Sequence, residues 1–155
     1  MIYVFDSSTL IDLFRHYYPN RFPSLWERFA QAVEAESIIS VREVFNEIGQ
    51  GDDRLLEWAK THRDFFQPPD QEELVFVAQI FAVPHFQSLV RKQERLQGKP
   101  VADPFVIAKA KVLQGCVVTQ ESNKPNASQI PNVCQHFGIA CLNLEGFMER
   151  ENWIF

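Results

Sequence analysis

The chain has 155 residues, of which 46% are hydrophobic and 13% aromatic, enough for one folded domain with an aromatic core. Its longest apolar run is far below the roughly 20 residues of a membrane helix, so we expect no membrane-spanning segment. The net charge of −5 argues against a simple basic coat for nucleic acid. It leaves open a metal-assisted site, because a bound divalent cation would offset clustered carboxylates.

The three cysteines predict the cellular compartment. Cys116, Cys134 and Cys141 form no C-x-x-C pair, and their number is odd. This favours free, buried thiols in a reducing cytoplasm over a disulfide framework or a zinc site. The first apolar run, Ile2–Phe5, has no basic region ahead of it and is interpreted as a strand, not a signal peptide. We therefore expect a cytoplasmic protein.

In the first half of the chain, short apolar strands alternate with helices. Ser7, Ser8 and Thr9 are suited to cap the first helix, and Ser24 to cap the second. The pattern predicts strands at 3–5 and 37–40, and helices at 10–17, from 24, around 44–48 with an end at Gly49, and from Asp52 or Asp53.

The second half continues the alternation. Pro68-Pro69-Asp70 ends one element and starts a helix over about 71–95, interrupted at Pro84. A helix from Asp103, a strand at 116–119, a short helix from Pro131 and a strand at 139–142 follow. This order predicts an α/β fold, with a mostly parallel sheet and helices on both faces. In such sheets the active crevice lies at the carboxyl ends of the strands.

Acidic residues fall at those positions. Asp6 follows the first strand, Glu121 lies just beyond the strand at 116–119, and Asp103 begins a helix. Glu43 and Glu47 are four residues apart and share one helical face. Carboxylates brought together would repel one another, and hard divalent cations relieve that repulsion. The sequence therefore predicts a site for Mg²⁺ or Mn²⁺.

Each acid also has a structural interpretation. Asp6 could cap the first helix, and Asp103 before Pro104 is a good N-cap followed by an N1 proline. Glu43 and Glu47 could be solvated helix positions, and Glu121 could be an ordinary turn residue. Capping and metal binding are compatible, since a cap needs only one carboxylate oxygen. The ordered set, and no single residue, carries the prediction.

Four segments in this order resemble a PIN domain: Tyr3–Ser8, Glu43–Ile48, Ala102–Ala110 and Val117–Glu121. The chain is most similar to the DUF4411 branch of PIN-like proteins, which is related to the VapC toxins. Further similarity at Tyr18-Pro19, Phe22–Trp26 and Ile130–Cys134 extends the resemblance over nearly the whole chain, 1–155, as a single domain.

The resemblance implies a PIN-like fold and a metal-dependent ribonuclease that uses Mg²⁺ or Mn²⁺. It assigns the catalytic and metal-binding roles to Asp6, Glu47, Asp103 and Glu121. It also implies supporting roles for Ser8 and Thr119, with Glu43 as an alternative second acid, and an RNA substrate and an antitoxin protein as partners. The sequence departs from the commonest pattern at Glu121, where aspartate is usual.

The basic residues that could bind an RNA backbone are most closely spaced between residues 91 and 99. Arg91, Lys92, Arg95 and Lys99 could contact phosphates, or could be a solvated helix end. The four histidines, His16, His62, His85 and His136, lie outside the motifs and are interpreted as structural or surface residues.

Other interpretations stay open. Asp6 after a strand, with Thr9 nearby, would also fit a phosphatase of the haloacid-dehalogenase type. That chemistry needs a second aspartate two positions on, where this chain has Ser8. A nuclease acting on DNA would use the same carboxylates. A catalytically silent PIN-like module that binds RNA or protein is favoured by Glu121 and by the acidic pI. The apolar end at 153–155 is expected to pack on the core or to form a homodimer contact.

Overall fold

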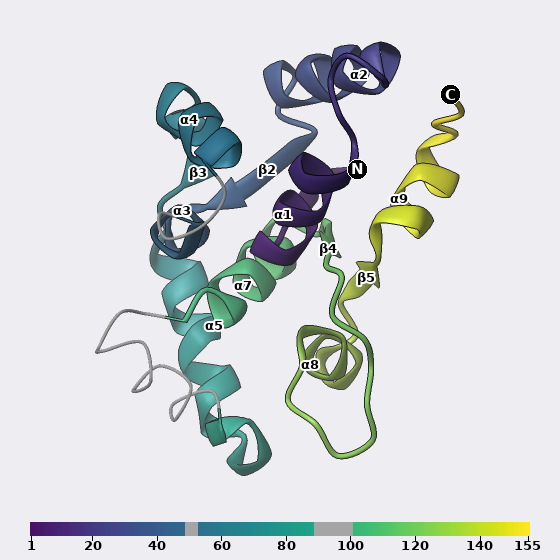
Figure 1. Ribbon diagram of the computed structural model, residues 1–155. Coiled ribbons are helices and arrows are strands. Elements are labelled where there is room, and N and C mark those ends of the chain that lie inside the picture. The colour runs from purple at the N-terminus through teal and green to yellow at the C-terminus, as the bar shows by residue number, and fades with distance from the viewer. Residues whose placement is uncertain (49–52, 89–100) are drawn as a thin grey trace.

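The computed structural model describes residues 1–48, 53–88 and 101–155 (Figure 1). All the strand pairs are parallel, in the order β3-β2-β1-β4-β5. The strands are β1 (Tyr3–Phe5), β2 (Ile38–Val41), β3 (Phe66–Gln67), β4 (Cys116–Val118) and β5 (Ala140–Leu142). The predicted parallel sheet is confirmed. The basic residues Arg91, Lys92, Arg95 and Lys99, and the predicted helix end at Gly49, lie outside the described residues.

Helices connect the strands. They are α1 (Ser7–His16), α2 (Pro23–Glu34), α3 (Arg42–Ile48), α4 (Asp53–Thr61), α5 (Gln71–Ala82), α7 (Asp103–Leu113), α8 (Ile130–Phe137) and α9 (Leu144–Glu151). Two short 3₁₀ turns, η1 (Arg63–Phe65) and η2 (Pro84–Gln87), complete the described elements. The helix predicted from residue 71 ends at Ala82, just before Pro84, as the missing amide donor of proline requires.

The central strand β1 shows how both faces of the sheet are covered. Tyr3 and Phe5 point to one face, where the ring of Phe147 in α9 lies 4.7 and 5.2 Å from their rings. Phe29 in α2 packs on the same face, 6.4 Å from Phe5. The helix α7 packs against β1, β2 and β4. Since α2 and α9 occupy the Tyr3 and Phe5 face, α7 covers the face to which Val4 points, and the prediction of helices on both faces is confirmed.

The core is rich in aromatic side chains. Phe14 of α1 lies 4.8 Å from Trp26 of α2 and 5.4 Å from Trp58 of α4, measured between ring centroids. Phe29 lies 5.6 Å from each of these tryptophans. Edge-to-face and tilted ring pairs of this kind add to the free energy gained by burying apolar area. They hold α1, α2 and α4 together beside the sheet.

Helix starts differ from the predictions by one to three residues. The helix α1 begins at Ser7, so Ser7, Ser8 and Thr9 form its first turn and Asp6 takes the N-cap position. The N-cap of α2 is Phe22, not Ser24, because Pro23 supplies a pre-set φ angle for the first turn. The N-cap of α7 is Ala102, so the prediction that Asp103 occupies this position is wrong by one residue.

The sequence patterns did not predict β3 and α9. The strand β3 has two residues, too few for an alternating pattern. The helix α9 had a local signal: the side chain of Asn143 accepts a hydrogen bond from Gly146 N at 2.8 Å, as an N-cap does. After α9, the ring of Trp153 packs 5.0 Å from Phe147, which confirms a core contact for this part of the C-terminal segment. Ile154 is 76% exposed.

A buried ion pair joins α5 to α7. Lys109 Nζ lies 2.9 Å from Glu73 Oε1, and both side chains are buried. Glu73 also completes a capping box, since its carboxylate accepts a hydrogen bond from Asp70 N while Asp70 Oδ1 accepts one from Glu73 N. One carboxylate therefore caps α5 and neutralises a lysine on the neighbouring helix.

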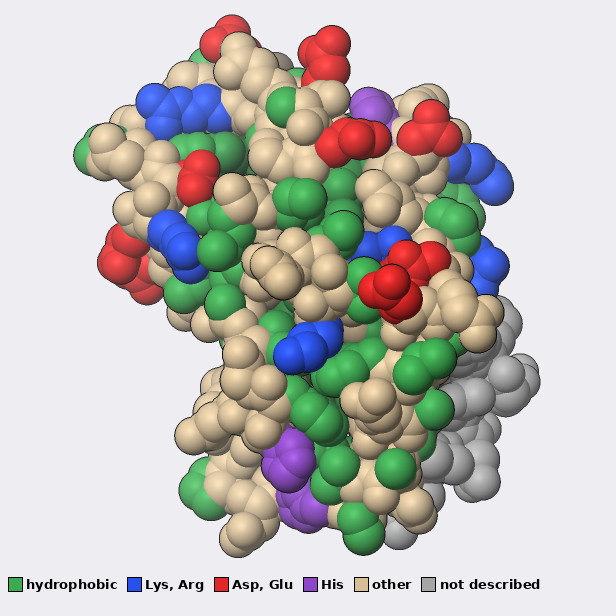
Figure 2. Space-filling view, turned by 180° about the vertical axis from the view of Figure 1, so that it is seen from behind, with side chains coloured by type: hydrophobic (Ala, Val, Ile, Leu, Met, Phe, Trp, Pro, Cys, Tyr) green, Lys and Arg blue, Asp and Glu red, His purple; other side chains and the backbone are tan. Residues whose placement is uncertain are grey.

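The distribution of charged side chains and the state of the cysteines agree with what the sequence predicts. On the described part of the face in Figure 2, acidic and basic side chains are scattered among apolar and neutral ones. The three cysteines are free thiols, with Cys116 and Cys134 buried, as predicted. Among the described helices, none is both long enough and apolar enough to cross a bilayer.

Candidate active site at the carboxyl ends of the strands

Asp6 follows β1 directly and is buried, with 2% of its surface exposed. Although it stands at the N-cap position of α1, its side chain accepts no capping hydrogen bond. Instead, Asp6 Oδ2 accepts hydrogen bonds from Ser8 Oγ at 2.7 Å and from Thr119 Oγ1 at 3.0 Å. The capping interpretation of the Asp6 side chain is therefore wrong. Two hydroxyl groups fix this carboxylate at the end of the strand.

Glu47, on α3, is the second acid at this end of the sheet. Its Oε1 accepts a hydrogen bond from Ala102 N at 2.9 Å, and its Oε2 accepts one from Ser7 Oγ at 2.9 Å. Ser7 Oγ is also 3.4 Å from Asp6 Oδ1. A single hydroxyl group therefore contacts the carboxylates of Asp6 and Glu47, which are 41 positions apart along the chain.

The pKa of Glu47 shows which charges surround it. Burial raises this pKa, the hydrogen bonds from Ala102 and Ser7 lower it, and the nearby carboxylates of Asp103 and Asp6 raise it again, so that the net shift is upward. Asp6, Glu47 and Asp103 thus form one electrostatic group, which we call the acidic triad. Its three members come from the ends of β1, α3 and the start of α7.

Asp103 is the first residue of α7 and is 4% exposed. Ser7 Oγ contacts the carboxylates of Glu47 and Asp6, and the residue before Asp103 also contacts Glu47, so the two aspartates lie on one side of the domain. Ala102, which precedes Asp103, donates its backbone N–H to Glu47. The start of α7 therefore supplies the acidic triad with both a carboxylate and a hydrogen-bond donor.

Glu121 lies at the edge of the triad and is half-buried. Its Oε2 accepts a hydrogen bond from Ile130 N, at the start of α8, at 2.9 Å. Its backbone N–H donates to Thr119 Oγ1 at 3.2 Å, so the Thr119 hydroxyl contacts both Asp6 and the Glu121 backbone. Glu121 is placed next to the predicted site, with one carboxylate oxygen directed at α8.

Glu43 and Glu47 share one face of α3 but have different partners. Glu43 Oε2 accepts hydrogen bonds from Arg42 Nη2 at 2.9 Å and from Arg42 Nε at 3.1 Å, and the side chain is 1% exposed. Its charge is therefore already balanced by a guanidinium. Glu47 faces two other carboxylates, and the contacts favour it over Glu43 as the second acid of the site.

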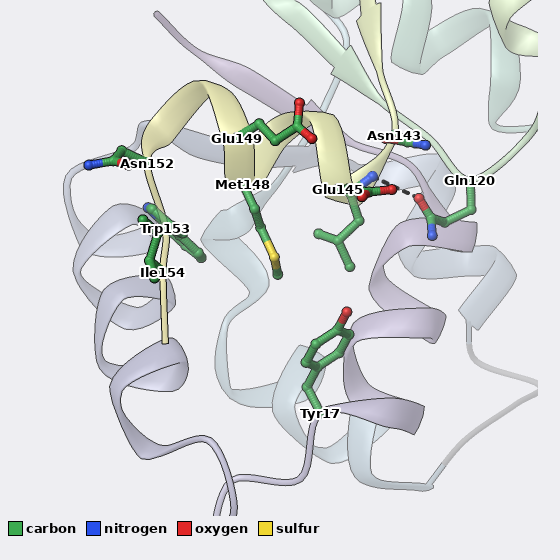
Figure 3. A pocket seen from close by; sticks show the side chains of 10 residues that line it. Tyr17, Gln120, Asn143, Glu145, Met148, Glu149, Asn152, Trp153 and Ile154 are labelled. Carbon is green, nitrogen blue, oxygen red and sulfur yellow. Dashed lines mark hydrogen bonds between the residues drawn. The ribbon is translucent and has the colours of Figure 1, made fainter.

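Gln120 was not predicted as a site residue, yet it connects three elements. Its backbone N–H donates to Ser8 Oγ at 3.0 Å, and its side chain donates to Asp12 Oδ2 at 2.8 Å. Gln120 Oε1 accepts a hydrogen bond from Leu144 N at 2.8 Å, drawn as the dashed line in Figure 3. Ser7 was likewise predicted only as a cap. These contacts depend on the tertiary arrangement and have no local sequence signal.

Two open hollows meet at Gln120. The one in Figure 3, of about 720 Å³, lies between Tyr17 and α9. The other has a volume of about 490 Å³ and includes Thr119 and Glu121 in its lining. Because the Thr119 hydroxyl donates to Asp6, this residue connects the second hollow to the acidic triad.

The chemistry of the triad suits a hard divalent cation. Its donors are carboxylate oxygens, the ligands that Mg²⁺ and Mn²⁺ favour. Within residues 1–48, 53–88 and 101–155, no three histidine, cysteine or acidic side chains are grouped closely enough to hold an ion by themselves. Mg²⁺ usually keeps several of its water ligands, so one or two protein carboxylates suffice to bind it.

Comparison with known proteins identifies a family. A family model described as a domain of unknown function, DUF4411, matches residues 3–155. A search among curated proteins found no match.

Proposed function

Since the chain belongs to the DUF4411 family, whose function is unknown, we propose a function from the site itself: a metal-dependent ribonuclease of the PIN-like type. The observation that carries the proposal is the acidic triad. Asp6, Glu47 and Asp103 are far apart along the chain, yet Ser7 Oγ contacts the carboxylates of both Asp6 and Glu47, and the backbone N–H of the residue before Asp103 donates to Glu47. That edge is where α/β sheets bind their substrates.

Each residue has a proposed role. Asp6 and Asp103 would hold the metal directly, and Glu47 and Glu121 would hold it partly through water. When bound, Mg²⁺ or Mn²⁺ would supply a water ligand of lowered pKa and positive charge for the phosphate oxygens. Ser8 and Thr119 orient Asp6 through the hydrogen bonds they donate. Ser7 and the Ala102 N–H orient Glu47 in the same way.

We place this activity in a toxin with a separate antitoxin protein as partner. This part of the proposal rests on the sequence resemblance to VapC-type PIN proteins. Expression of the chain in a bacterial host is then expected to arrest growth, and Asp6→Asn is expected to abolish the arrest. Equal growth arrest by both proteins would contradict the toxin assignment.

The ribonuclease is tested with purified protein, total RNA and a single-stranded RNA oligonucleotide, with and without Mn²⁺. Asp6→Asn and Asp103→Asn are expected to reduce metal-dependent cleavage on the order of 100-fold. Glu34→Gln, an exposed acid at the end of α2, is the matched control and should retain wild-type rates. Unchanged cleavage by Asp6→Asn would refute the proposal. Calorimetric titration with Mn²⁺ should show binding that Asp103→Asn weakens.

A second candidate function is a catalytically silent module that binds RNA or protein. One observation favours it: Glu121 Oε2 accepts a hydrogen bond from Ile130 N, so this oxygen is directed at α8. The same experiment separates the candidates. A silent module binds the RNA oligonucleotide but leaves it intact at every Mn²⁺ concentration, and a single-stranded DNA oligonucleotide in parallel tests for a nuclease that acts on DNA.

A further inference from the structure

The smaller hollow beside the acidic triad has an unusual composition. Four amide side chains contribute to its lining, namely Gln120, Asn123, Gln135 and Asn143. Its apolar part comes from Pro131, Ile139, Cys141 and Leu142. Among the described residues that line it, Glu121 is the only charged one, and it belongs to the candidate site. Its volume of about 490 Å³ falls within the range of small-molecule sites.

Hydrogen bonds hold the amides in place, although these side chains are exposed. Asn123 Nδ2 donates to Gln135 Oε1 at 2.7 Å. Asn132 Nδ2 donates to Asn123 Oδ1 at 3.1 Å and to Lys124 O at 2.7 Å, which ties the loop after β4 to α8. Gln120 is fixed by its bonds to Asp12 and Leu144. The amide edge of the hollow is therefore ordered before any ligand arrives.

We infer that this hollow binds a nucleobase of single-stranded RNA, next to the phosphodiester held at the acidic triad. The inference rests on the proposed ribonuclease function. It adds that the protein selects its RNA substrate by the base beside the cleaved phosphodiester. Amides carry both donors and acceptors, which match the edges of unpaired bases, and apolar side chains contact the faces of the ring. Thr119 and Glu121 belong to both the hollow and the site, so phosphate and base lie on adjacent surfaces.

Gln135 has a side-chain donor group that could bind a base. Its Oε1 is used by Asn123, and its Nε2 group makes no hydrogen bond to the residues that the structure describes. That group is available to donate to a ring nitrogen or a carbonyl oxygen of the base. Gln135 is exposed at the surface of α8, so its substitution leaves the core unchanged.

The larger hollow is a poorer site for a nucleotide because of its charge. Glu145 and Glu149 of α9 contribute to it, as Figure 3 shows, and Gln120 beside them is bonded to Asp12. These carboxylates repel the phosphates on either side of any base that enters. The described lining of the smaller hollow has one carboxylate, that of Glu121, and its amides add no charge.

The test compares RNA oligonucleotides of one length that differ in a single base beside the cleavage position. The wild-type protein should cleave one of the four at least about ten times faster than the poorest, and Gln135→Ala should reduce that ratio about tenfold. Gln79→Ala, an exposed amide on α5, is the matched control and should keep both the rate and the ratio. An unchanged ratio in Gln135→Ala overturns the inference and leaves the ribonuclease standing.

A second measurement keeps the inference testable without catalysis. The side-chain amide NMR signals of Asn123, Gln135 and Gln120 are followed as adenosine, cytidine, guanosine or uridine monophosphate is added. Shifts confined to these signals, in a protein that cleaves no RNA, would support the base site and refute the ribonuclease. If none of the four nucleotides shifts these signals, and the four oligonucleotides are cleaved at equal rates, the base site is refuted. The ribonuclease proposal is then unaffected.

Discussion

The hydroxyl group of Thr119 donates a 3.0 Å hydrogen bond to Asp6 Oδ2 across two neighbouring parallel strands. Phe5 and Val118, which precede these residues, are register partners of β1 and β4, so Asp6 and Thr119 leave the sheet side by side. Thr119 is 1% exposed, so water competes little for this bond. The strand pairing itself thus sets the position of the first carboxylate of the site.

We predict that Glu47 and Glu43 differ in their effect on activity. Glu47→Gln is expected to lower Mn²⁺-dependent RNA cleavage on the order of 100-fold, because it removes one charge of the acidic triad. Glu43→Gln, at the position paired with Arg42, is the matched comparison, with a loss below about fivefold. Initial rates at equal concentrations of folded protein measure both. A larger loss for Glu43→Gln would reverse the assignment.

Lys109→Met is expected to destabilise the protein by about 3–5 kcal/mol, because it leaves Glu73 as a buried charge without its lysine. Burial raises the pKa of Glu73 and the contact with Lys109 lowers it, and the net shift is upward. The double variant Glu73→Gln with Lys109→Met should lose less than the sum of the single variants. Urea unfolding measures these losses. Lys111→Met, an exposed position on the same helix, is the control, and a similar loss there would contradict the argument.

The raised pKa of Tyr3 predicts that the free energy of unfolding falls at alkaline pH. Burial and the hydrogen bond to Glu151 Oε2 raise its pKa from 10.0 to about 12. Between these two values the unfolded chain releases the phenolic proton while the folded chain keeps it, so the free energy of unfolding decreases as pH rises. Chemical unfolding at pH 8 to 11.5 should show this decrease in the wild type and a smaller one in Tyr3→Phe. The control Tyr18→Phe, at a residue 55% exposed, should behave as the wild type.

Gly115→Ala is expected to cost more stability than Gly138→Ala. A Cβ atom at Gly115 would lie 2.4 Å from the backbone oxygen of Ile2, beside the bond from Cys116 N to that same oxygen. Relieving the clash requires β1 and β4 to separate, at a cost of about 2–3 kcal/mol. Gly138 has a φ of +69° but nothing within 4 Å of the added atom, so alanine there costs about 1 kcal/mol. Thermal melts that reverse this order would contradict the account.

The fold could be predicted because its signals are local and periodic. The apolar runs that became β1, β2, β4 and β5, and the helical spacing in α1 and α7, are visible without tertiary information. The strand β3 could not be predicted, since two residues have no period and depend on pairing with β2. The start of α2 was misplaced because two signals, Pro23 and Ser24, compete within one turn.

The candidate site was predictable only in part. The positions of Asp6 and Asp103 follow from the rule that parallel strands end at one edge of the sheet. The choice between Glu43 and Glu47 does not, because both occupy one face of α3 and differ only in what packs against them. The hydrogen bonds from Ala102 N to Glu47 and from Ile130 N to Glu121 link segments that only the folded chain brings together.

The bond from Leu144 N to Gln120 has a practical consequence for dissecting this protein. Through Gln120, the first residue of α9 is joined to Ser8, whose hydroxyl orients Asp6. Cutting the chain after Asn143 would therefore disturb the distant carboxylate even if α9 never meets RNA. Point substitutions on the outer surface of α9, and not deletions, are the sound way to ask whether that helix takes part in recognition.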